Sequence, residues 1–133
     1  EEALRAQAAL AQQGRAACVT VIIEPGRLRS PRDELEAAFV LDEGRLQALF
    51  PPGMPRVILT HTRPEPMLGI LRRIDSGLAR TRALGYISRG GTLDVAGMLR
   101  ANRCTWLDAL RATALVTGWA LSEPDEQDQA LDN

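Results

Sequence analysis

Apolar and polar residues follow one another in blocks whose period changes from helical to strand-like and back. Residues 1–13 repeat small apolar side chains at helical spacing, which predicts a helix that ends at Gly14. Residues 17–23 form a run of β-branched apolar residues that stops at a Glu-Pro-Gly sequence. Such a run is typical of a strand that is buried on both faces.

The alternation continues to residue 119. Ser30 and Pro31 are typical of a helix start, with Ser30 as the cap, and they predict a helix to about Leu41. Because strands alternate with helices and arrive as buried apolar runs, we expect an α/β fold with a largely parallel sheet. The remaining expected elements are strands over 57–61 and within 80–87, and helices over 45–49, 67–74, 92–102 (opened by Thr92) and 106–119 (capped by Thr105).

The end of the chain differs in composition from the rest. Residues 122–133 contain five acidic residues and no basic one, and they have almost nothing apolar to bury. We therefore expect one domain over residues 1–121 and an acidic, disordered tail over residues 122–133.

Charge narrows the possible functions. The formal net charge is −1, which argues against nucleic acid as a partner. All 16 basic residues are arginine, and residues 56–111 carry ten arginines against four acids, an excess of +6. No apolar run reaches the ~18 residues that cross a membrane, and the first residues do not resemble a signal peptide. We expect a cytoplasmic chain, and the missing initiating Met suggests a processed chain or a piece of a longer one.

Two groups of residues are candidates for ligand binding. His61, the single histidine, and Arg63 lie at the carboxyl end of an expected strand, where ligands gather in open α/β sheets. Arg89, Gly90, Gly91 and Thr92 form a basic, glycine-rich junction before a helix, which is suited to a phosphate or carboxylate. Both groups also have purely structural interpretations: a strand-end histidine satisfied by the backbone, and a turn followed by a cap.

Residues 46–110 resemble the C-terminal domain of phosphoketolases, within the transketolase-like thiamine-diphosphate enzymes. The family motifs involved are LF-x-P-x-x-P, HGYP, RGY and EEGTTTTPFDM, followed by a helix. Here Arg63 replaces the Tyr of HGYP, Ser88 and Arg89 replace the two acids, and the threonine run is reduced to Thr92. The matching residues are Leu49, Phe50, Pro52, Pro55, His61, Pro64, Gly85, Tyr86, Gly90, Thr92, Met98 and Asn102.

The resemblance implies a three-layer α/β/α domain with a mixed, mostly parallel five-stranded sheet. It implies a domain that helps to pack a homodimer and borders the active site of a ketose-phosphate enzyme, but is not catalytic alone. Thiamine diphosphate and magnesium would be held by preceding domains of the same chain, and a sugar phosphate would be the substrate of the whole enzyme. Which ketose phosphate is used, and which of the family's reactions is performed, stays open.

Two other functions remain possible from the sequence. One is a stand-alone α/β regulatory module that binds an anionic metabolite through its arginine-rich strand ends. The other is a domain that serves assembly only, through its alanine-rich helices and its tryptophans, Trp106 and Trp119.

Overall fold

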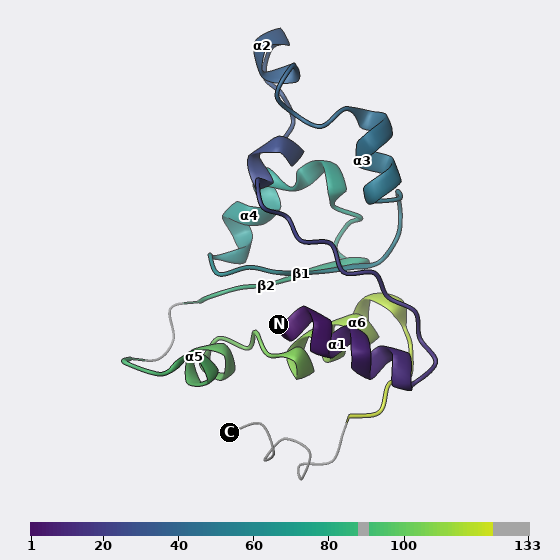
Figure 1. The fold of residues 1–133 in the computed structure, drawn as a ribbon, viewed down its shortest axis with the longest axis vertical. Coiled ribbons are helices and arrows are strands. Elements are labelled where there is room, and N and C mark those ends of the chain that lie inside the picture. Colours follow the sequence, from purple (N-terminus) through teal and green to yellow (C-terminus); the bar gives the residue numbers. More distant parts are fainter. Residues whose placement is uncertain (88–90, 124–133) are drawn as a thin grey trace.

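A computed structural model of the chain describes residues 1–87 and 91–123. Figure 1 shows a small sheet with helices on both sides, and α2 at one end of the longest axis. The elements, in chain order, are α1 (Glu2–Gln12), the 3-10 turn η1 (Pro25–Leu28), α2 (Glu34–Ala37), α3 (Glu43–Leu49), β1 (Arg56–Leu59), α4 (Pro64–Ile70), the 3-10 turn η2 (Arg72–Ile74), β2 (Thr81–Leu84), α5 (Val95–Ala101) and α6 (Trp106–Thr117).

The sheet consists of β1 and β2, which run parallel and pair from Arg56 opposite Thr81 to Leu59 opposite Leu84. Parallel neighbours need a crossover connection, and α4 with η2 supplies it. In Figure 1, α4 lies on one side of the strands, and α1 and α6 lie on the other. Because the strands run parallel, the carboxyl ends of both lie at the same edge of the sheet.

The expected five-stranded, three-layer sheet is wrong, because the described residues form only two strands in one small sheet. The expected strands over 57–61 and within 80–87 are present as β1 and β2. After β2 the described chain is used for α5 and α6, so it supplies no further strand.

Residues 17–23 are the main difference from the expected elements. The structure assigns them no strand, and the side chains of Val21 and Ile23 are 79% and 87% exposed. Only Ile22 between them packs against the core. An apolar β-branched run becomes a strand only where a neighbouring strand takes its backbone hydrogen bonds, and the described chain does not provide one here.

The apolar side chains are buried in two places. On one side of the sheet, η1, α3 and the crossover contribute a cluster of Leu28, Leu46, Leu71 and Ile74. On the other side, α1 packs along α6 through small residues, which allow the helices to approach closely. The buried residues of this second contact are Ala6, Leu10, Ala109, Leu110, Ala112 and Val116.

Several helix boundaries differ from the expected ones. α2 has four residues and is capped by Asp33, not Ser30, and α5 is capped by Asp94, not Thr92. An Asp closer to the first helical N–H groups competes successfully for the capping position. Thr105 caps α6 as expected, but α6 ends at Thr117, before Trp119.

No helix in the described ranges is long and apolar enough to span a bilayer.

Candidate functional site

The carboxyl ends of β1 and β2 form the edge to which the sequence pointed. Strand-like pairing continues there: the Thr60 N–H donates to the Leu84 carbonyl at 2.9 Å, and the Tyr86 N–H donates to the Thr62 carbonyl at 3.1 Å. These bonds bring His61 and Tyr86, which are 25 residues apart in sequence, to the same edge.

Gly85 makes this close approach possible. A Cβ atom at Gly85 would lie 2.8 Å from the Thr60 Cγ2 atom and 3.0 Å from the Pro64 Cδ atom, and closer still to the Thr62 carbonyl oxygen. Any larger residue at position 85 would push the backbone of the turn after β1 away. This turn therefore requires a glycine where it passes residue 85.

His61 presents an accessible imidazole at the edge. Its ring meets the ring of Tyr86 edge-on, with 5.8 Å between centroids and an interplanar angle of 85°. Edge-to-face packing is a favoured arrangement of aromatic rings, so this contact stabilises the observed orientation. His61 is exposed and Tyr86 is half-buried, so a ligand can reach the imidazole from solvent.

The other predicted site residues are only partly gathered here. Arg63 is exposed two residues after His61, and within the described chain its guanidinium has no hydrogen bond or ion pair. Gly91 and Thr92 are exposed in the bend that precedes α5. Arg89 and Gly90 lie outside the described residues, so the junction site stays a prediction.

A buried amide links the edge to α5. The side chain of Asn102 is 3% exposed, and its Oδ1 atom accepts from the Ile87 N–H at 2.9 Å. Its Nδ2 atom donates to the Met98 carbonyl at 2.9 Å. Asn102 thereby joins Ile87, in the continuation of β2, to the last turn of α5.

In the described residues no three His, Cys, Asp or Glu side chains are grouped so that they could hold a metal ion. The edge offers an imidazole, a guanidinium and hydroxyl groups. These groups suit an anionic or hydroxyl-bearing ligand rather than a cation.

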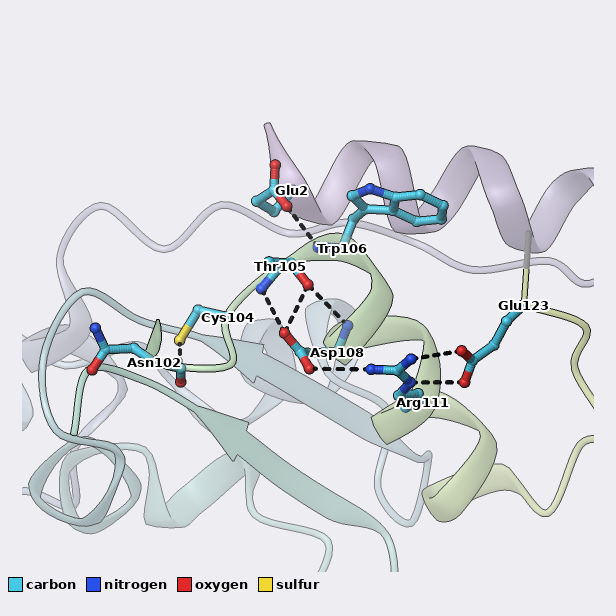
Figure 2. A network of polar contacts seen from close by, with 8 residues as sticks. All are labelled: Glu2, Asn102, Cys104, Thr105, Trp106, Asp108, Arg111 and Glu123. Atoms are coloured by element: carbon cyan, nitrogen blue, oxygen red, sulfur yellow. Dashed lines mark hydrogen bonds and ion pairs between the residues drawn. The ribbon is translucent and has the colours of Figure 1, made fainter. Parts of the chain in front are cut away.

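The most extensive polar network lies elsewhere, at the start of α6 (Figure 2). The Glu2 carboxylate accepts from the Trp106 N–H at 2.6 Å, so the first residue of α1 stabilises the N-terminus of α6. Thr105 and Asp108 form a reciprocal capping box. Arg5 lies over the Trp106 ring at 5.2 Å, and Arg15 lies over the Trp119 ring at the same distance. The network joins helices, so its role is structural.

The same network continues to the end of the described chain. Arg111 donates to both carboxylate oxygens of Glu123, at 2.7 and 2.6 Å, and this pairing lowers the pKa of Glu123 and raises the pKa of Arg111. Ser122 pairs with the Gln13 side-chain amide through two hydrogen bonds. Burial, and then the charge of Asp108, raises the pKa of the Cys104 thiol, which makes this cysteine a poor nucleophile.

Sequence reasoning missed two of these features. The structural role of Glu2 depends on the packing of α1 against α6 and has no local signal. Asn102 was noted through the family resemblance, but its burial was not foreseen. The burial of Asn102 could have been suspected from its position, because it is a polar residue directly after α5 and shortly before the Thr105 cap of α6.

Comparison with known proteins gives no relative for this chain: no protein-family model, no curated protein and no solved structure matches it.

Proposed function

We propose that this chain is a non-catalytic domain of a thiamine-diphosphate-dependent ketose-phosphate enzyme of phosphoketolase or transketolase type. In that role it packs the enzyme dimer and borders the active site with its His61 edge. Thiamine diphosphate and magnesium would be bound by other domains of that enzyme, and they supply the carbon–carbon cleavage chemistry there.

One observation carries the proposal: the residues that resemble the family motifs contact one another in space. His61 lies against Tyr86, Gly85 fits against Pro64, and Asn102 binds the backbone N–H of Ile87, the residue after Tyr86. Motifs that recur together in a family are expected to form one physical unit, because each residue then constrains the others.

The contacts also account for the spacing of the motifs. The turn after β1 needs Pro64 and Thr62 next to a residue without a side chain, and Gly85 meets that need. The aromatic residue that follows the glycine then meets the histidine. The proposal does not depend on a five-stranded sheet, which the described residues do not form.

The test compares His61→Ala with wild type in the full-length protein. We expect the variant to lower kcat/KM for a ketose phosphate such as xylulose 5-phosphate, with the melting temperature little changed, because His61 is exposed. Leu78→Ala, at a side chain that is 98% exposed, serves as the matched control. Absence of thiamine-diphosphate-dependent turnover in the full-length protein would overturn the proposal, and so would turnover catalysed by the isolated 133 residues.

A second function is favoured by one further observation, the exposed guanidinium of Arg63 beside His61 without an ion pair in the described chain. These two groups suit a stand-alone module that binds an anionic metabolite. NMR titration of the isolated chain with inorganic phosphate and with a sugar phosphate tests it. Saturable shifts at His61 and Tyr86 that disappear in Arg63→Ala would favour this function, and unchanged spectra would exclude it.

A further inference from the structure

The region between residues 20 and 50 has two unpartnered apolar features. The first is an arm, residues 29–41, which carries α2 and stands at one end of the molecule's longest axis (Figure 1). The second is a groove of about 520 Å³ beside the base of the arm. Apolar side chains that are exposed together in this way mark an interaction surface.

The arm has a defined conformation although it projects from the body. The Glu36 carboxylate binds the guanidinium groups of Arg29, at 3.1 Å, and of Arg32, and it also accepts from the Arg32 backbone N–H at 2.9 Å. Asp33 caps α2, and the Leu41 N–H donates to the Arg27 carbonyl at 2.7 Å across the base of the arm. These bonds fix the arm before any partner binds, which lowers the entropic cost of binding.

The arm presents two large apolar side chains to solvent. Leu35 is 79% exposed and Phe39 is 72% exposed. Glu34, next to Leu35, is exposed and has no ion pair within the described chain. The tip of the arm is therefore an apolar pair beside an unpaired negative charge.

The groove has the complementary character. Its apolar lining includes Ile22, Leu28, Leu41 and Phe50, and its charged lining residues are Arg27, Arg45 and Glu24. Both arginines make only exposed ion pairs, with Glu24 at 3.8 Å and with Asp42 at 3.4 Å. Such pairs contribute little and exchange readily for a new partner.

We propose that the arm of one copy of this chain inserts Leu35 and Phe39 into the groove of a second copy, with Glu34 against Arg27 and Arg45. Leu28 and Leu41, at the base of the arm, both line the groove, and α2 stands at the end of the longest axis (Figure 1). A two-fold axis can therefore place each arm against the other copy's groove. The same contact is then made twice, and the interface is closed. This proposal specifies a surface for the dimer packing in the proposed function, but the contact itself needs no enzyme activity.

Sedimentation velocity of the full chain over the micromolar concentration range tests the proposal. We expect a concentration-dependent dimer whose Kd rises about thirtyfold in Phe39→Ser, the effect typical of removing an aromatic anchor. Because Phe39 is exposed, the variant keeps its fold, which circular dichroism verifies. Leu78→Ser removes an apolar side chain that is even more exposed and lies outside the arm and the groove, and it should leave the Kd unchanged.

A charge exchange identifies the contact. Glu34→Arg and Arg45→Glu should each weaken the dimer, and the double variant should recover most of the loss. A chain that stays monomeric at high concentration would overturn the proposal, even if the full-length enzyme assay succeeds. A dimer whose Kd does not change in Phe39→Ser would also overturn it. So would a monomer in which hydrogen exchange shows the α2 amides protected, because the arm would then fold onto its own groove.

Discussion

Gly85 lies against the carbonyl oxygen of Thr62 so closely that the space of a single methyl group is already occupied. This contact joins the turn after β1 to the continuation of β2, and it places the His61 and Tyr86 rings together. The local architecture of the candidate site therefore depends on one residue that has no side chain.

Gly85→Ala should destabilise the chain by about 3 kcal/mol, since the neighbouring atoms belong to backbone and to a proline ring that cannot easily move. Gly69→Ala is the matched control, because its added Cβ has open space within a helix. That variant should be stabilised by up to about 1 kcal/mol. Chemical denaturation of both measures the contrast, and equal effects would contradict the crowding at Gly85.

Asn102→Leu should destabilise the chain by about 2–3 kcal/mol, because it leaves the Ile87 N–H without its partner. The Met98 carbonyl loses the side-chain bond and keeps only the backbone N–H of residue 102. Hydrogen exchange provides a local measurement as well. The amide of Ile87 should exchange much faster in the variant, whereas the amides of α1 and α6 should change only with global stability. Unchanged protection at Ile87 would show that this bond is not important in solution.

The acid dependence of the arm follows from Glu36. Its hydrogen bonds with Arg32, and then the charge of Arg29, lower the pKa of Glu36 to about 2. The folded pKa is below the unfolded value of about 4.3, so the contribution to stability is present above that value and is lost as the pH falls toward 2. NMR titration of the Glu36 carboxyl carbon should show the low pKa, and Arg32→Ala should raise it toward the ordinary range. An unchanged pKa of Glu36 in Arg32→Ala would contradict the hydrogen bonds between Arg32 and Glu36.

The sequence predicted elements well where the signal is local. The helix over 1–13, both strands of the sheet and the Thr105 cap all follow from periodicity or from side chains next to the backbone they bind. The strand predicted over residues 17–23 is absent from the structure. An apolar β-branched run indicates that a segment tends to be buried, but it does not indicate that a neighbouring strand is available to pair with it.

The candidate site was predictable only in part, for a related reason. The place of His61 at a strand end follows from the strand prediction, and the structure confirms that place. Its contact with Tyr86 depends on the register between β1 and β2, and the role of Asn102 depends on how α5 returns to β2. Both are tertiary relationships that no local pattern contains.

The role of Glu2 at the start of α6 can be tested by a single substitution. Its carboxylate lies at the N-terminus of α6, where it accepts from the Trp106 N–H and interacts favourably with the helix dipole (Figure 2). Glu2→Ala should therefore cost about 1 kcal/mol, and Glu2→Gln, which keeps an acceptor but loses the charge, should cost less. Glu1→Ala is the control, because Glu1 is exposed. Thermal or chemical denaturation at neutral pH measures the series. If Glu1→Ala and Glu2→Ala have equal effects, the first turn of α1 does not stabilise α6, and the packing of α1 on α6 would then depend on its apolar face alone.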